Sequence, residues 1–89
     1  MKVKVLFFAS LREQLKCGSE EIELPPEAST LGALRAHLAD RGGNWQSALA
    51  ETRPVRMAVN QDMVPRGGAN AIAIKAGDEI AFFPPVTGG

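Results

Sequence analysis

Apolar and polar residues alternate with a period of two at the start of the chain, which is the pattern of a half-buried β-strand. In the stretch KVKVLFFA, Val3, Val5 and Phe7 share one face. The opposite face takes the remaining side chains, Lys2, Lys4, Leu6 and Phe8. A second strand, SEEIELP over residues 19–25, is expected to pair with the first as a hairpin with a lengthened connection.

The same alternation returns near the other end of the chain, in EIAFFP over residues 79–84. Ile80 and Phe82 share one face of this strand, and Phe83 lies on the other. In a fold of this order the first and last strands lie side by side and parallel. We therefore expect Phe8 and Phe83 to be neighbours at the strand ends nearest the C-terminus. An exposed aromatic pair is a candidate docking surface.

Two further strands are expected between these ends. The stretch VRMAVNQ over residues 55–61 alternates apolar and polar side chains. A short edge strand is expected near Met63 and Val64, and Pro65 stops it because proline lacks a backbone N–H.

A short helix is predicted over residues 10–18, SLREQLKCG, directly after the first strand. Ser10 and Glu13 have the spacing of a capping box, and Gly18 suits a left-handed helix end.

The main helix is predicted in STLGALRAHLADRGG, residues 29–43. Ser29 or Thr30 can cap its start, and Gly42 can end it. Its apolar stripe consists of Leu31, Leu34 and Leu38. A further short helical piece is expected in NWQSALAE, residues 44–51.

This order of elements predicts an α+β fold, a two-layer sandwich in which one main helix lies across one face of a mixed sheet of about five strands. The chain has 89 residues, a length that suits one domain. We assign residues 1–85 to that domain and 86–89 to a flexible C-terminal tail.

Composition and charge exclude several classes of function. Lys plus Arg and Asp plus Glu are 10 each, without a block of like charge, so no nucleic-acid surface is expected. No apolar stretch has the length of a transmembrane helix or of a signal-peptide core. The single cysteine, Cys17, fits a reducing compartment, and one Cys with one His offers no metal site. We therefore expect a cytoplasmic protein without membrane or nucleic-acid partners.

The ending FFPPVTGG carries the strongest chemical signal. Pro84 and Pro85 cannot continue a sheet ladder, so they end the strand and stiffen the exit of the chain. The four residues 86–89 reach roughly 13 Å when extended, far enough to enter a groove on another protein. Because Gly88 and Gly89 have no Cβ, the terminal carboxylate is open from both faces.

Such a carboxylate needs activation by another protein. It is ionised at neutral pH and is a poor electrophile, and the simplest activation is an acyl adenylate made with ATP. The chain itself has neither GxxxxGK[ST] nor GxGxxG. The activated group could pass to sulfur or to an amine. The residues alone therefore leave three functions open: a sulfur carrier, a protein modifier joined to lysines as ubiquitin is, and an interaction domain with an inert tail.

Four stretches in order, KVLFFASLRE, AVNQ, AGDEIAF and FFPPVTGG, resemble the small, sulfur-carrier subunits of molybdopterin synthase. The resemblance spans almost the whole chain. It implies the ubiquitin-like β-grasp fold and a role in molybdenum cofactor biosynthesis. It further implies that Gly89 is adenylated by an enzyme similar to the ubiquitin-activating class. Gly89 is then expected to become a thiocarboxylate that donates sulfur to cyclic pyranopterin monophosphate.

The resemblance also implies roles for the residues around that glycine. Val86, Thr87 and Gly88 thread the tail into the large catalytic subunit, within a heterotetramer. Contacts with partner proteins are implied at five positions, Phe8, Arg12, Met63, Phe83 and Pro85. No bound cofactor is implied, because the activating enzyme uses the ATP. A carrier for thiazole synthesis stays as an alternative, although such chains usually lack the paired aromatic and paired proline residues before the tail.

Overall fold

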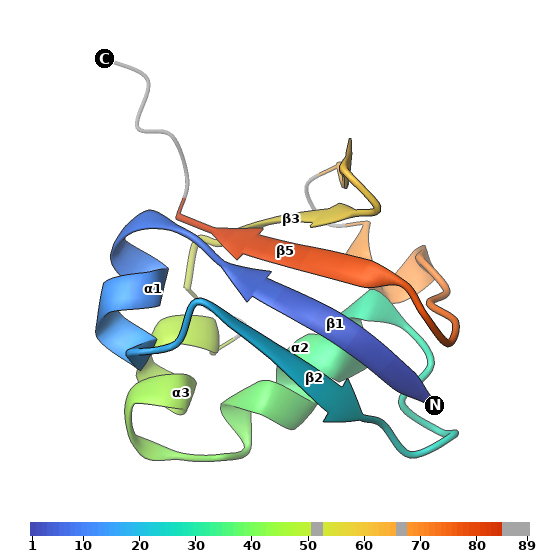
Figure 1. The fold of residues 1–89 in the computed structure, drawn as a ribbon, viewed down its shortest axis with the longest axis horizontal. Helices are drawn as coiled ribbons and strands as arrows, with labels where there is room; N and C mark the ends of the chain where they lie inside the picture. The colour runs from blue at the N-terminus through green and yellow to red at the C-terminus, as the bar shows by residue number, and fades with distance from the viewer. Residues whose placement is uncertain (51–52, 66–67, 85–89) are drawn as a thin grey trace.

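The computed structural model describes residues 1–50, 53–65 and 68–84, and these residues form one mixed sheet covered by helices (Figure 1). The strands are β1 (Lys2–Phe7), β2 (Ser19–Glu23), β3 (Arg56–Val59), β4 (Asp62–Met63) and β5 (Glu79–Phe83). The helices are α1 (Ala9–Leu15), α2 (Leu31–Ala39), α3 (Gly43–Leu49) and the short 3-10 helix η1 (Ala69–Ala71). The predicted tail residues 86–89 lie outside the described residues, as does Pro85.

The sheet has the strand order β2-β1-β5-β3-β4, so the two ends of the chain supply its centre. Strand β1 pairs antiparallel with β2 and parallel with β5, as predicted. Strand β3 pairs antiparallel with β5 on one side and with the short edge strand β4 on the other. The α+β sandwich with a five-strand mixed sheet is therefore confirmed.

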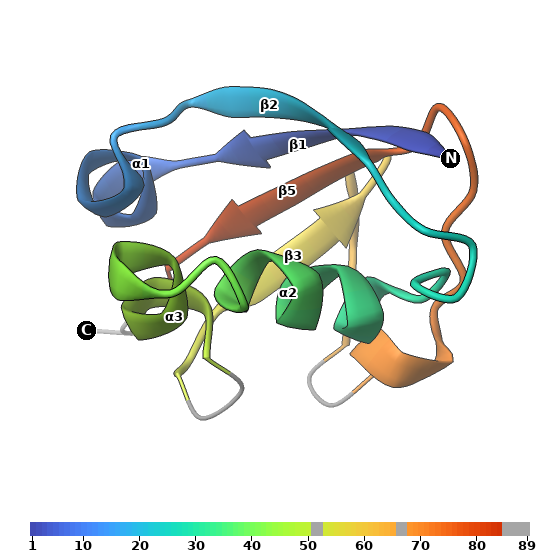
Figure 2. The same ribbon diagram turned by 90° about the horizontal axis from the view of Figure 1, so that it is seen from below.

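The helices α2 and α3 cover one face of the sheet, and the core lies between them and the strands (Figure 2). The predicted alternation is confirmed on both central strands, because Val5 and Phe7 of β1 and Ile80 and Phe82 of β5 are almost fully buried. From the helical side, the whole predicted stripe contributes, Leu31, Leu34 and Leu38. Burial of these side chains is the main stabilising term, because each removes a large apolar area from water.

The prediction that one main helix dominates is wrong, because that helix is shorter than expected and is one of three of similar length. The described chain has three α-helices, and the longest, α2, has 9 residues. The predicted cap is confirmed at its start, where Thr30 Oγ1 accepts a hydrogen bond from the Ala33 N–H (3.1 Å). The helix ends at Ala39, and Gly42 instead precedes α3 with a positive φ of 77°. The left-handed Gly42 turns the chain between α2 and α3, and α3 corresponds to the short helical piece predicted over residues 44–51.

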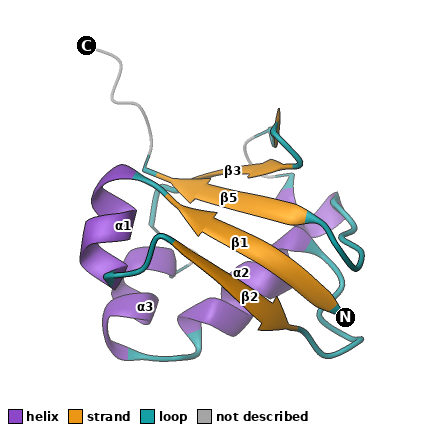
Figure 3. Cartoon of the chain, in the orientation of Figure 1, coloured by secondary structure: helices purple, strands orange, loops and turns teal. Residues whose placement is uncertain are grey.

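The predicted ends of α1 are also wrong. The helix begins at Ala9, with Phe8 at the N-cap and no side-chain cap, so Ser10 lies inside the helix and forms no capping box. The left-handed residue at its C-terminus is Lys16 (φ 55°), not Gly18. Helix α1 lies with α3 at the end of the sheet where β5 finishes (Figure 3). Strand β5 finishes at Phe83, and we call this residue the root of the tail. Helix α1 therefore borders the root of the tail.

Candidate functional site

An aromatic pair marks the point where the chain leaves β5 for the tail. Strands β1 and β5 are parallel neighbours in the register Phe7↔Phe82, so both finish at the same end of the sheet. The rings of Phe8 and Phe83 meet edge to face, with centroids 6.2 Å apart, and Phe8 is 46% exposed. The expected pair is confirmed, and its solvent-facing rings are a candidate docking surface.

The aromatic pair continues into a row of apolar residues on the face of the sheet that the helices leave uncovered. Strand register places Leu6 opposite Ala81, Ala81 opposite Ala58, and Ala58 opposite Met63. Met63 ends the row on β4 and is 52% exposed. We call this surface the outer apolar patch. It consists of Leu6, Phe8, Ala58, Met63, Ala81 and Phe83, of which Ala58 is only 4% exposed.

Three of the sequence-predicted partner contacts therefore come together in the patch: Phe8, Met63 and Phe83. Sequence reasoning did not name Leu6, Ala58 or Ala81 as members. The alternation indicated which face each occupies, but only the register shows that they bridge the aromatic pair to Met63.

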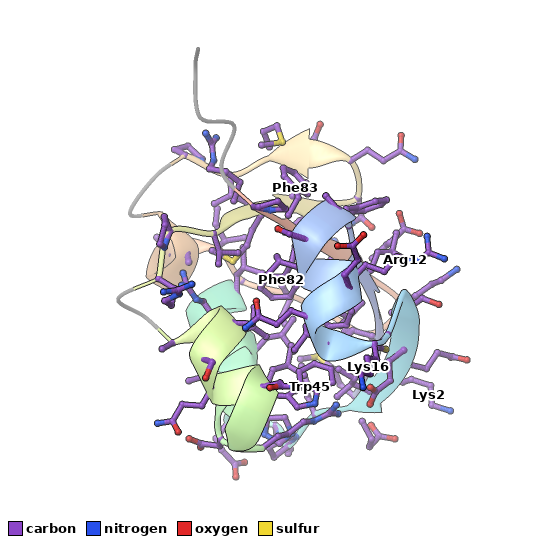
Figure 4. The ribbon with its side chains drawn as sticks, turned by 90° about the vertical axis from the view of Figure 1, so that its left-hand side faces the viewer. Lys2, Arg12, Lys16, Trp45, Phe82 and Phe83 are labelled. Atoms are coloured by element: carbon purple, nitrogen blue, oxygen red, sulfur yellow. The ribbon has the colours of Figure 1, made fainter. Side chains whose placement is uncertain are left out.

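Arg12 lies one helical turn from this surface, on α1. Its backbone N–H donates to the Phe8 carbonyl (3.4 Å), and its side chain is exposed (Figure 4). A Cβ built at Gly18 would lie 3.2 Å from Arg12 Nε, so the small residue leaves room for the guanidinium. Arg12 is thus placed where it could meet an acidic group of a partner that covers Phe8.

The predicted tail follows the described part of the chain. Pro85 and the predicted tail residues, Val86, Thr87, Gly88 and Gly89, lie outside the described residues. The root of the tail, Phe83, has a defined position, because it is the last residue of β5 and pairs with Arg56 of β3.

Buried rings support the patch from the core side. Phe7 stacks on Phe82 with centroids 5.8 Å apart and meets Trp45 of α3 edge to face at 5.4 Å. Arg41 lies over the Trp45 ring at 4.4 Å and forms a bidentate ion pair with Glu20 of β2 (3.0 and 2.6 Å). The hydrogen bonds and charge of Arg41 hold the pKa of Glu20 below its ordinary value, although partial burial opposes this. These contacts connect both ends of the chain to the helical layer.

A second polar cluster lies at the other end of β5, where the sequence reads GDE. Within the described part of the chain, Asp78 is the only charged residue that is buried, at 6% exposure. Its carboxylate accepts from Asn60 Nδ2 (3.0 Å) and from the Lys75 N–H (2.9 Å). Burial acts to raise the pKa of Asp78, but these two hydrogen bonds and the charge of Lys75 outweigh it and leave the pKa below its ordinary value.

We expect the substitution Asp78→Asn to lower the free energy of unfolding at pH 7 by about 1–3 kcal/mol, because hydrogen bonds to a charged group are lost. The folded-state pKa of Asp78 lies below its unfolded value. The contribution of Asp78 is therefore complete above the unfolded pKa and is lost as the pH falls through the folded pKa. Urea denaturation from pH 7 to pH 2 should show the wild type and the variant converging in acid. A constant difference across that range would contradict this role.

The other features considered show no catalytic or metal-binding arrangement within the described residues. Cys17 is partly buried, and its thiol donates to the Ser19 carbonyl (3.4 Å), which fits a plain structural thiol. No group of three or more potential metal ligands occurs in residues 1–50, 53–65 and 68–84. None of the helices in that part of the chain is long and apolar enough to cross a membrane.

A groove of about 830 Å³ opens between α2 and β3, on the side away from the outer apolar patch. Arg35 lies in its wall and donates to the carbonyls of Leu49 (2.9 Å), Ala50 (2.7 Å) and Arg53 (2.6 Å). The guanidinium thereby satisfies carbonyls at the C-terminal end of α3, which have no partner within the helix. Its contacts give it a structural role.

Comparison with known proteins gives the chain and its fold a family context. The family model described as "ThiS family" matches residues 5–89. The molybdopterin synthase sulfur carrier subunit of Haemophilus influenzae is 46% identical over 87 residues, which cover 98% of this chain and 99% of that protein.

Two solved structures extend the likeness to three dimensions. A putative molybdopterin converting factor, subunit 1, from Pyrococcus furiosus superimposes with a TM-score of 0.76 at 31% identity, covering 97% of this chain and 99% of that one. A chain in the complex of subunits 1 and 2 of the molybdopterin-converting factor from Helicobacter pylori gives 0.66 at 27% identity, with both chains fully covered. The chain therefore belongs to the ThiS family and, within it, to the sulfur carrier subunits of molybdopterin synthase.

Proposed function

We propose that the C-terminal carboxylate of Gly89 is the group that carries sulfur in this protein. In the first step this carboxylate attacks the α-phosphate of ATP and releases pyrophosphate, which gives an acyl adenylate. A sulfur nucleophile at the oxidation level of sulfide then displaces AMP and leaves a thiocarboxylate on Gly89. Membership of the family and the ending FPPVTGG support this assignment. In the final step the thiocarboxylate sulfur bonds to cyclic pyranopterin monophosphate, and water cleaves the C–S bond to Gly89, which leaves the sulfur on the substrate and restores the carboxylate.

The adenylation step needs a second protein, because the chain has no phosphate-binding motif. We assign the adenylation to an enzyme similar to the ubiquitin-activating class. We place the chemistry in the cytoplasm, where ATP is available and a lone thiol such as Cys17 stays reduced. Gly88, Thr87 and Val86 are the residues that would thread through the narrow entrances of the two partner sites.

The observation that carries the proposal is the pairing of Phe8 with Phe83 at the root of the tail. A tail of a few residues can deliver its end to a fixed point only if the body docks at a fixed distance from that point. The outer apolar patch offers such a docking surface. We propose that the patch, together with Arg12 and Pro85, binds the large subunit of molybdopterin synthase in a heterotetramer. The Helicobacter pylori structure contains both kinds of subunit.

The intact mass of the protein, purified without a C-terminal tag from cells that make the activating enzyme, tests the proposal. We expect a fraction whose mass reflects one oxygen-to-sulfur exchange, and fragmentation should map that exchange to Gly89. Because hydrolysis can erase the product, the purified protein should also be treated with ATP, the activating enzyme and a sulfur donor. Failure to gain sulfur in that reaction would contradict the proposal. Lysine-linked conjugates in its place would indicate a protein modifier.

A further inference from the structure

The two sequence stretches that the sulfur chemistry does not use, AVNQ and GDE, meet in the fold. Asn60 follows β3 and Asp78 precedes β5, so both lie at the end of the sheet opposite the root of the tail. The Asn60 side chain donates to Asp78 Oδ1 (3.0 Å) and accepts from the Glu79 N–H (3.0 Å). The Asn60 backbone N–H adds a third bond, to the Glu79 carbonyl (2.7 Å). One asparagine thus ties the end of β3 to the start of β5.

Asn60 belongs to a turn whose backbone conformation is unfavourable on its own. Asn60 (φ 50°) and Gln61 (φ 74°) are both left-handed, and together they make the two-residue turn from β3 to β4. Asparagine tolerates this conformation, but glutamine at the second position lacks the freedom of the glycine that such turns favour. The hydrogen bonds of Asn60 to Asp78 and Glu79 therefore offset a local backbone cost.

Strand β4, which follows the turn, is held in position by few interactions of its own. Strand β4 consists of Asp62 and Met63, lies at the edge of the sheet, and pairs with β3. Both residues are exposed, and the Val64 N–H donates to the Met57 carbonyl (2.9 Å) just beyond them. A two-residue edge strand is marginal without a fixed turn. Met63 is nevertheless the residue that ends the outer apolar patch.

We propose that Asn60, anchored by the buried Asp78, is a positioning residue that holds Met63 in the outer apolar patch for docking of the large subunit. Asn60 lies at the end of the sheet opposite the root of the tail and is not a member of the outer apolar patch. It acts through the turn and β4, so its loss should weaken docking without changing sulfur transfer once the partner is bound. The inference rests on the proposed function, because it presumes that the patch is the docking surface.

The substitution Asn60→Gly tests this inference with little disturbance of the backbone. Glycine keeps the left-handed turn and the backbone bond to Glu79, and it removes both side-chain bonds. We expect the amide of Val64 to exchange its hydrogen about tenfold faster in the variant, because β4 opens more often. The matched control is Ile22→Val, a mild core change in β2 at the opposite edge of the sheet. In this control, the difference between the opening free energy of the Val64 amide and the free energy of global unfolding should be unchanged.

Docking is measured with the large subunit from the same organism, by calorimetry and by the rate of sulfur transfer. We expect Asn60→Gly to raise the carrier concentration needed for half-maximal rate about tenfold, at an unchanged saturated rate. Met63→Ala should weaken docking by a similar factor. Because both changes act on one contact, the double variant should be no more than about threefold weaker than Met63→Ala alone.

Three results would overturn the inference. Losses of affinity that multiply in the double variant would show that Asn60 acts independently of Met63. An equal loss in Ile22→Val would show a general effect of stability. Unchanged exchange at Val64 in Asn60→Gly would show that the turn does not need the side chain. Failure of the wild type to bind the large subunit would instead contradict the proposed function, and the docking part of this inference with it.

Discussion

Deleting Gly89 should abolish sulfur transfer and leave folding and docking unchanged. The deletion shortens the tail by about 3.3 Å and moves the carboxylate away from the reacting groups. A misplacement of about 1 Å can already cost a factor of about 100 in rate, so we expect a loss of at least that size. Formation of the thiocarboxylate by the activating enzyme should fail as well. Single-turnover transfer, with the large subunit in excess, measures the loss directly.

The matched control for the deletion is a chain with one alanine added after Gly89. This chain keeps every native residue and also displaces the terminal carboxylate, so it should lose activity to the same degree. Both variants should bind the large subunit as the wild type does, because the outer apolar patch is intact. If the deleted chain keeps more than a tenth of the wild-type transfer rate, Gly89 is not the sulfur-carrying residue.

The strands and the aromatic pair were predictable because a period of two is a strong and local signal. Val5 and Phe7 face the core while Phe8 faces outward, and the same alternation separates Phe82 from Phe83. The pairing of Phe8 with Phe83 then followed from the parallel arrangement of the two strands. The aromatic pair, which forms one side of the candidate site, could therefore be predicted without knowledge of the strand register.

The helix ends were not predictable from local signals, because long-range contacts decide them. The Phe8 N–H still donates to the Phe82 carbonyl (3.1 Å), so the chain leaves the sheet and enters α1 at adjacent residues. This leaves no residue free for the capping box that the spacing of Ser10 and Glu13 indicated. The left-handed end falls on Lys16 because the chain must turn back toward β2.

The polar cluster of Asn60 and Asp78 was missed for a related reason. The two residues are 18 positions apart, and Asp78 stands beside Glu79 in a polar turn, where exposed carboxylates are usual. The sequence contains a signal all the same, since Asn-Gln after an apolar run indicates a turn with left-handed residues. Its link to Asp78 depends on β3 and β5 being partners, which only the register provides.

The substitution Phe83→Asp should break docking of the large subunit while the fold persists. Phe83 is partly exposed, and its ring contacts Phe8 outside the main core, so its loss leaves the buried rings of Phe7 and Phe82 in place. An aspartate there would replace the ring with a charge that the partner must desolvate, even though Arg56 of β3 lies opposite it. Loss of a central aromatic contact costs about 2 kcal/mol or more, which is about a 30-fold loss of affinity. The added desolvation should raise this above 100-fold.

The matched control is Ala36→Asp, which places the same charge on an exposed position of α2, in the layer on the other face of the sheet. It should bind the large subunit with wild-type affinity. Titration calorimetry compares the two variants, and urea denaturation confirms that both are folded. If Ala36→Asp weakens binding as much as Phe83→Asp does, the effect is one of net charge. If Phe83→Asp binds normally, the partner does not cover the root of the tail, and the tail must reach its target without help from the outer apolar patch.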